Sequence, residues 1–225
     1  MTLRLIIADD HPLFRAAIRQ VIAQQWPDAK IIEAANVDQI QQAAEQSGSE
    51  LDLLILDLHM PGALGFSALS WFTGHYPDTP VVMISANTHP DTVSRAIDLG
   101  AAAFVTKSAE MDSIVECLQK VLAGERNLHP TLTADGQGAS MQSLDVADAL
   151  ASLTPQQFRV LSMLAEGLLN KQIAYELNVK EATIKAHMTE ILRKLKVNSR
   201  TQAVLALGSL AANPPAEMNA CPEEE

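Results

Sequence analysis

Four short apolar segments in the first half of the chain each end in a polar residue that can do chemistry. The segments are 3–8, 53–56, 81–84 and 102–105. Short apolar runs separated by helix-length stretches are typical of buried strands in a parallel sheet, and βαβ connections place the carboxyl ends of all strands at one edge. Open α/β sheets bind their ligands at that edge. The residues expected to meet there are Asp9, Asp10, Asp57, Ser85 and Lys107.

The three carboxylates of this set predict a metal site. Clustered carboxylates repel one another, and a small hard cation with oxygen ligands, Mg²⁺ above all, would relieve that repulsion. Phosphoryl transfer depends mainly on positioning and charge stabilisation, which a metal ion, the Lys107 ammonium and the Ser85 hydroxyl supply together. We expect Asp57 to be the nucleophile, because Asp9 and Asp10 stand side by side as metal holders.

These motifs resemble the receiver domain of two-component response regulators. The resemblance extends over residues 1–124 and is carried by segments 9–10, 56–62, 85–86 and 100–107. It implies an α/β doubly wound, five-stranded parallel sheet of the flavodoxin-like kind. It also implies that a sensor histidine kinase is a partner of the protein.

Individual roles follow from the same resemblance. Asp57 would accept the phosphoryl group, and Mg²⁺ would be bound by Asp10, Asp57 and the main-chain carbonyl of His59, with Asp9 assisting through water. Ser85 and Phe104 match the hydroxyl and the aromatic residue that move together on phosphorylation.

Two further residues, Ala103 and His11, stand close in sequence to the predicted site residues. Ala103 stands where the family more often has glycine. We interpret His11, which precedes Pro12, as a loop residue rather than a ligand or base.

The charge of the chain is unevenly distributed. Residues 1–130 carry 8 Lys and Arg against 16 Asp and Glu, whereas residues 152–211 carry 8 against 4. The basic segment is the part of the chain that could bind a polyanion such as DNA. No apolar stretch is long enough to span a bilayer, and Asp9 ends the first apolar run too early for a signal peptide, so we expect a cytoplasmic protein without a membrane partner.

Composition also predicts the boundaries between domains. Residues 125–151 are rich in Gly, Ser, Thr and Asp and are expected to form a linker, with a short helix beginning near Leu144. Residues 212–225 are acidic and are expected to be a disordered tail. Cys117 and Cys221 form neither a disulfide framework nor a metal-ligand set and are predicted to be free thiols.

The second domain is predicted to be all-α. Thr154, Pro155 and Gln157 form a capping box in its glutamine form, which starts a helix that ends near Gly167. A short helix over 170–177, a tight connection and a basic helix over 181–195 then predict a helix-turn-helix. The apolar positions of the basic helix share one face, which is expected to be the packed face. These positions are Ile184, Met188, Ile191, Leu192 and Leu195.

Residues 152–211 closely resemble the LuxR-type helix-turn-helix. Joined to a receiver, this domain gives the architecture of the NarL/FixJ class, which binds double-stranded operator DNA in the major groove. Lys185, Ala186 and Thr189 match base-reading positions, whereas Lys171 and Lys194 match phosphate contacts. The full set of predicted DNA-binding residues is Lys171, Thr183, Lys185, Ala186, His187, Thr189, Arg193 and Lys194.

The predicted function is a phosphorylation-regulated DNA-binding transcription factor with slow autodephosphorylation as its only chemistry. A degenerate receiver controlled by a protein or nucleotide partner is the alternative. A Mg²⁺-dependent phosphohydrolase would need a second Asp two residues after the nucleophile, where this chain has His59. A small-molecule-gated LuxR-type activator would have no use for the acidic set.

Two expectations concern assembly and control. The helix over 199–210 has an apolar stripe and is expected to pair with its copy in a homodimer on DNA. The acidic receiver is expected to cover part of the basic recognition helix when it is not phosphorylated.

Overall fold

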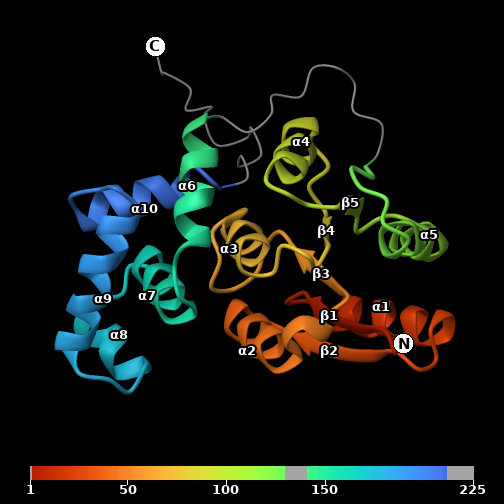
Figure 1. Cartoon of the computed structure of the whole chain (residues 1–225), viewed down its shortest axis with the longest axis horizontal. Coiled ribbons are helices and arrows are strands. Elements are labelled where there is room, and N and C mark those ends of the chain that lie inside the picture. Colours follow the sequence, from red (N-terminus) through yellow and green to blue (C-terminus); the bar gives the residue numbers. More distant parts are fainter. Residues whose placement is uncertain (1, 130–140, 212–225) are drawn as a thin grey trace, which may run out of the picture.

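Five parallel strands form the sheet of the first domain, in the order β2-β1-β3-β4-β5 (Figure 1). The computed structural model describes residues 2–129 and 141–211. The chain crosses over between β1 and β3, and this switch point is where doubly wound sheets open a crevice at the strand carboxyl ends. The strands are β1 (Arg4–Ala8), β2 (Lys30–Ala34), β3 (Leu53–Asp57), β4 (Val81–Ser85) and β5 (Ala103–Thr106).

Helices cover both faces of the sheet because alternate strand residues point to opposite sides. Leu5 and Ile55 pack toward α1 (Pro12–Gln25) and α5 (Met111–Leu122). Ile6 and Leu54 belong to the core on the other face, which α2, α3 and α4 cover. The bounds of these three helices are α2 (Val37–Ser47), α3 (Ser67–His75) and α4 (Pro90–Asp98), and a short 3-10 turn, η1 (Gly48–Glu50), follows α2.

The four strands predicted from apolar runs are confirmed, but the fifth strand, β2, has no such run. Lys30 is exposed and Glu33 is exposed in β2, whereas every residue of β3 and β4 is buried. An edge strand faces water on one side, so it lacks the continuous apolar run that reveals a central strand.

Four helices form the second domain, and their starts agree with the predicted signals. The Thr154 hydroxyl accepts a hydrogen bond from the Gln157 main-chain N–H at 3.3 Å, and the Gln157 side chain accepts one from the Thr154 N–H at 3.1 Å. Ile184, Met188 and Ile191 are buried, which confirms the packed face of the basic helix. The helices are α7 (Pro155–Ala165), α8 (Asn170–Glu176), α9 (Glu181–Lys194) and α10 (Arg200–Gly208).

The predicted linker contains more structure than its composition indicated. An 11-residue helix, α6 (Met141–Ala151), packs along α3, and its residues Val146 and Leu150 are buried. Before it, the Leu128 carbonyl accepts a hydrogen bond from the Phe104 N–H, and the Leu128 N–H donates to the Ala102 carbonyl. Leu128 therefore extends the edge of the sheet beside β5. Residues 130–140, the predicted tail 212–225 and Cys221 lie outside the described residues.

The two domains share a continuous apolar core. They meet where α6 packs beside α3 (Figure 1). The Trp71 indole N–H donates to the Leu153 carbonyl at 3.1 Å, and the Phe66 N–H donates to the Leu210 carbonyl at 2.9 Å. The Arg95 guanidinium lies over the Phe66 ring and donates to two carbonyls just beyond α10. Those acceptors are Ser209, at 2.6 Å, and Ala211, at 3.1 Å.

Cys117 is a free thiol in α5, and burial raises its pKa to about 11, so the thiol stays protonated near neutral pH. Among the described residues, no helix combines the length and the apolar character needed to cross a bilayer.

Candidate functional site

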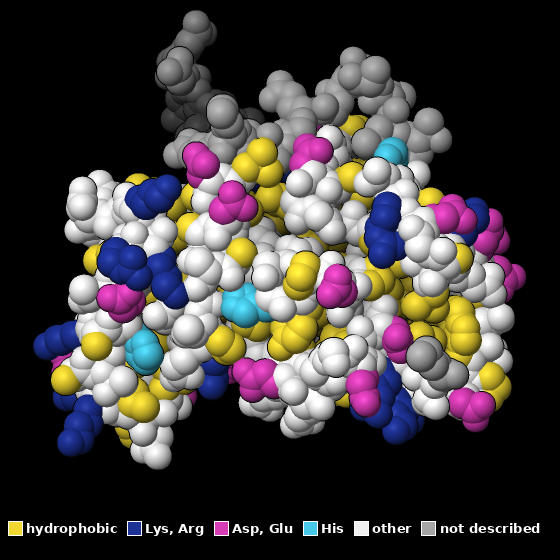
Figure 2. Space-filling model, in the orientation of Figure 1, with side chains coloured by type: hydrophobic (Ala, Val, Ile, Leu, Met, Phe, Trp, Pro, Cys, Tyr) yellow, Lys and Arg dark blue, Asp and Glu magenta, His cyan; other side chains and the backbone are white. Residues whose placement is uncertain are grey.

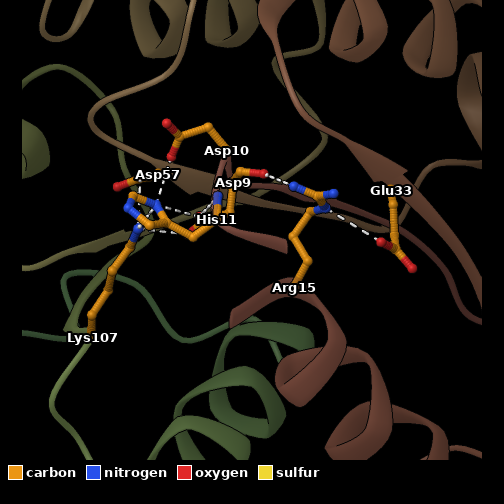
Figure 3. Close-up of polar contacts among 7 residues, drawn as sticks. All are labelled: Asp9, Asp10, His11, Arg15, Glu33, Asp57 and Lys107. Atoms are coloured by element: carbon orange, nitrogen blue, oxygen red, sulfur yellow. Dashed lines mark hydrogen bonds and ion pairs between the residues drawn. The ribbon is translucent and has the colours of Figure 1, made fainter. Parts of the chain in front are cut away.

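The acidic residues predicted to converge do lie together at the carboxyl edge of the sheet (Figure 3). Asp9 follows β1 and Asp57 ends β3, so both stand at the switch point of the sheet. One carboxylate oxygen from each of Asp9, Asp10 and Asp57, with a ring nitrogen of His11, all lie within 4.8 Å of one another. Asp9 and Asp57 are buried, whereas Asp10 is exposed.

Lys107 bridges the two buried carboxylates. Its ammonium lies 2.7 Å from Asp9 Oδ2 and 2.8 Å from Asp57 Oδ2. Burial alone would lower the pKa of Lys107, but the hydrogen bonds and charges of Asp57 and Asp9 outweigh it and raise the pKa above its usual value. The lysine therefore remains a cation at neutral pH and offsets part of the repulsion between the carboxylates.

The oxygen donors fit a hard divalent cation. Mg²⁺ prefers carboxylate, carbonyl and water oxygens, and three carboxylates, two from the loop after β1 and one from the end of β3, are within reach of a single ion. His59, whose main-chain carbonyl is the predicted fourth donor, follows Asp57 by two residues and has an exposed side chain. The acidic set could thus bind Mg²⁺ as receiver domains do.

His11 is a loop residue, as predicted, and its side chain lies against this cluster. Its Nδ1 lies 2.6 Å from Asp10 Oδ1, 3.2 Å from Asp9 Oδ1 and 3.5 Å from Lys107 Nζ. The His11 N–H also donates to Asp9 Oδ1 at 2.7 Å, which closes a tight turn between β1 and α1. Its position next to the acid pair was the signal in the sequence, but the ring orientation depends on the turn.

The predicted switch residues lie beside the acidic cluster. Ser85 is fully buried, its hydroxyl accepts a hydrogen bond from the Asn87 N–H at 3.1 Å, and its carbonyl accepts one from the Lys107 N–H at 2.9 Å. This last bond ties β4 to the residue that bridges the carboxylates. Phe104 is buried in the core shared with α4 rather than turned to solvent.

The second domain presents the residues expected to read DNA on the outer side of α9. Thr183, Lys185, Ala186, Thr189 and Arg193 are all exposed. Intrahelical ion pairs hold two of the basic side chains, Lys185 with Glu181 at 3.0 Å and Arg193 with Glu190 at 2.9 Å. Exposed pairs of this kind are weak and can be exchanged for a phosphate or a base edge. Figure 2 shows Lys and Arg side chains gathered over this domain.

Three other predicted DNA contacts lie in different surroundings. Lys171 is exposed on α8, and His187 is half-buried on the side of α9. Lys194 is also half-buried, and its ammonium donates to the Ser152 carbonyl at 2.6 Å and to the Gln157 side chain at 2.8 Å. Lys194 therefore ties α9 to the start of α7, a role that its spacing on α9 did not reveal.

The expectation that the receiver covers part of the recognition helix is wrong for this structure, because the outer face of α9 is exposed. Lys185, Ala186 and Thr189 are accessible with both domains present. The receiver instead contacts α6, α7 and the end of α10, partly through the ion pair of Asp38 with Arg159 at 2.6 Å. Net charge could not predict this arrangement, because the interface depends on shape and on main-chain carbonyls.

Comparison with known protein families divides the chain in the same way. Residues 5–119 match the response regulator receiver domain, and residues 151–207 match the bacterial regulatory proteins of the luxR family. The two matches correspond to the sheet domain and to the helical domain.

Relatives match along nearly the whole chain. The glycerol metabolism activator of Pseudomonas putida is 39% identical over 212 residues, covering 92% of this chain and 96% of the relative. The nitrate/nitrite response regulator protein NarL of Escherichia coli K12 is 31% identical over 203 residues, covering 89% and 93%.

A solved structure of two RcsB dimers bound to two parallel DNAs shares the fold, with a TM-score of 0.54 and 22% identity over 94% of this chain and all of that one. The family matches, the relatives and the acidic edge agree with one another. This chain belongs to the NarL/FixJ family of DNA-binding response regulators, which join a receiver domain to a LuxR-type helix-turn-helix.

Proposed function

We propose that Asp57 accepts a phosphoryl group in the presence of Mg²⁺ and that this modification controls DNA binding by the second domain. The observation that carries the proposal is the buried Asp57 carboxylate, paired with Lys107 at 2.8 Å and grouped with Asp9 and Asp10 at the switch point of the sheet. The alternative of a degenerate receiver is not favoured, because all of these acceptor residues are retained.

The residues of the site divide the chemistry among them. Asp57 Oδ1 would attack phosphorus, since Lys107 contacts Oδ2, and the donor's bond to phosphorus would break as the new bond forms. Lys107 and the Ser85 hydroxyl would then contact the phosphoryl oxygens. Bound Mg²⁺, held by Asp10, Asp57 and the His59 carbonyl with Asp9 nearby, supplies charge neutralisation. Removal of free Mg²⁺ should therefore prevent modification.

The chain is a regulator and not an enzyme that turns over an external substrate. Its only proposed chemistry is transfer of a phosphoryl group to its own Asp57 and slow hydrolysis of that group. His59 stands where a phosphohydrolase would need a general-acid carboxyl, which supports slow loss of phosphate. We propose a sensor histidine kinase as the physiological donor and the cytoplasm, where chromosomal DNA is reached, as the place of action.

The second domain is proposed to place α9 in the major groove of a two-fold symmetric operator. Exposed Ala182 and Ala186 allow close approach of the helix to the groove floor, while Lys185 and Thr189 face the bases. Leu205 is 68% exposed on α10, which supports a role for this helix in pairing with a second copy.

Lys185→Ala should weaken operator binding, because this exposed lysine lies on the outer side of α9. A contact to a base edge would cost about 1–3 kcal/mol and relax sequence preference, whereas a phosphate contact would weaken all sequences alike and lower the salt slope by about one. Fluorescence anisotropy over a range of salt concentrations measures both quantities. Lys120→Ala, an exposed change on the receiver, is the matched control, and unchanged binding by Lys185→Ala would remove this residue from the interface.

Control is proposed to run through the contacts between the domains. Arg95 on α4 and Phe66 before α3 both contact main-chain groups at or beyond the end of α10. In the closed arrangement, in which the receiver packs against α6, α7 and the end of α10, these contacts restrain α10 but leave the reading face of α9 exposed. Movement of Ser85 and Phe104 on phosphorylation would alter α4 and favour an open state in which α10 can pair.

A further inference from the structure

Arg15 connects the acidic site to the neighbouring edge strand (Figure 3). It lies one turn into α1, and its guanidinium Nη1 donates to the main-chain carbonyl of Asp9 at 2.6 Å. Its Nε pairs with Glu33 Oε2, on β2, at 3.3 Å. The Arg15 side chain is only 14% exposed, so the fork is held in place between β1 and β2.

Each polar group of Asp9 is engaged by a different part of the receiver. Its N–H donates to the Ala34 carbonyl at 3.1 Å, and its carbonyl accepts from Arg15. Its carboxylate accepts from the His11 N–H and pairs with the Lys107 ammonium. The Asp9 residue is thus fixed at both its main chain and its side chain.

Asp10 is held much less directly. Its carboxyl side chain is 37% exposed and is contacted by the exposed ring of His11. The peptide group that joins Asp9 to Asp10 is planar, so a hydrogen bond to the Asp9 carbonyl also fixes the direction of the Asp10 Cα. Arg15 thus constrains the backbone from which the Asp10 carboxylate projects.

We propose that Arg15 is a positioning residue for divalent-cation binding, acting through the Asp9 carbonyl on the placement of Asp10. The inference rests on the proposed metal site and goes beyond it, because Arg15 is a cation and would contact neither the metal nor phosphate. Groups that orient metal ligands from behind commonly change metal affinity by about 10-fold to 100-fold when they are removed.

Whether Arg15→Gln weakens or strengthens cation binding distinguishes a positioning role of Arg15 from a simple effect of its positive charge. Removing a positive charge near the acidic cluster should strengthen cation binding by Coulomb attraction. Loss of the hydrogen bond to the Asp9 carbonyl should instead weaken binding. A weaker affinity in Arg15→Gln therefore cannot be attributed to the change in net charge.

The chain offers a matched control on the same helix. Arg19 also lies near Glu33, at 3.6 Å, but its side chain is 64% exposed. Arg19→Gln removes the same charge from α1 and leaves the Arg15 contact with Asp9 in place. Arg15→Lys keeps the charge, but its single ammonium cannot hold the carbonyl and Glu33 together as the guanidinium fork does.

The test is titration of the full-length protein with Mn²⁺ alone, in which the paramagnetic resonance signal of free Mn²⁺ reports the dissociation constant without any phosphorylation. Circular dichroism verifies that each variant is folded. We expect Arg15→Gln to bind about 10-fold more weakly than the wild type and Arg19→Gln to bind as tightly or slightly more tightly. If Arg15→Gln does not fold, Arg15→Lys provides the test, and we expect its affinity for Mn²⁺ to be several-fold lower than that of the wild type.

Wild-type affinity in a folded Arg15→Gln protein, tighter binding by it, or equal weakening in both glutamine variants would overturn the positioning role. Unchanged affinity in Arg15→Lys would do the same. A different result identifies failure of the proposed function: wild-type protein that binds no Mn²⁺, or Asp57→Asn protein that binds as tightly as wild type, would remove the metal site itself.

Discussion

Asp57→Asn should abolish transfer of phosphate from acetyl phosphate and Mg²⁺ to the protein. The amide has neither the charge nor the nucleophilic oxygen of the carboxylate, and Asp57 is the buried acid that Lys107 contacts at the end of β3. Mass spectrometry of the intact chain measures the addition of one phosphoryl group. Lys107→Ala should likewise lose the modification or the DNA-binding response to it.

The control for this prediction is Asp78→Asn. Asp78 is an exposed acid before β4, at the opposite edge of the sheet from the strand ends that carry the site. It should be modified as the wild type is. Equal labelling of Asp57→Asn and wild type would show that the acceptor is a different residue.

Gly74→Ala should open the closed arrangement of the two domains. A Cβ at Gly74 would overlap the side chain and Cα of Ala151 where α3 packs on α6. Alanine is about 1 kcal/mol more favourable than glycine within a helix, so α3 itself should form at least as well. Overpacking commonly costs about 1–3 kcal/mol, which corresponds to a shift of about 5-fold to 150-fold toward the open state.

Small-angle X-ray scattering should detect the opening as a larger radius of gyration, and operator binding without phosphodonor should become tighter. The variant Ala151→Gly combined with Gly74→Ala removes the overlap with the Ala151 Cβ but leaves the Ala151 Cα 2.7 Å from the new Cβ, so it should return both measurements only part of the way toward wild type. Opening without any change in DNA affinity would separate the interface from control of DNA binding. A Gly74→Ala protein as closed as wild type would contradict the close packing itself.

The spacing of apolar and capping residues within single segments was enough to predict most of the fold. The four apolar runs are strands, the glutamine capping box starts α7, and Met188 is packed inside the second domain. These features depend on residue spacing within one element, which the sequence shows directly. The edge strand β2 and the helix α6 carry weaker periodic signals, and their assignment depends on what packs against them.

The sequence by itself determined that Asp9, Asp57 and Lys107 would meet. Parallel strands joined by helices have their carboxyl ends at one edge whatever the side-chain details, so residues at strand ends are brought together by connectivity alone. The same holds for the outward face of α9, which is fixed by helical period and by the apolar residues opposite it.

Only the tertiary structure decided which contacts these residues make. No periodic pattern in the sequence indicates three of these contacts. They are the Arg15 bond to a main-chain carbonyl, the Lys194 bond to the Ser152 carbonyl, and the Trp71 bond to Leu153, which is 82 residues away. Their partners are carbonyl groups, which every residue carries, so residue type cannot reveal them. Which carbonyl lies within reach is set by how the elements pack, and that packing also leaves α9 exposed while it holds the end of α10.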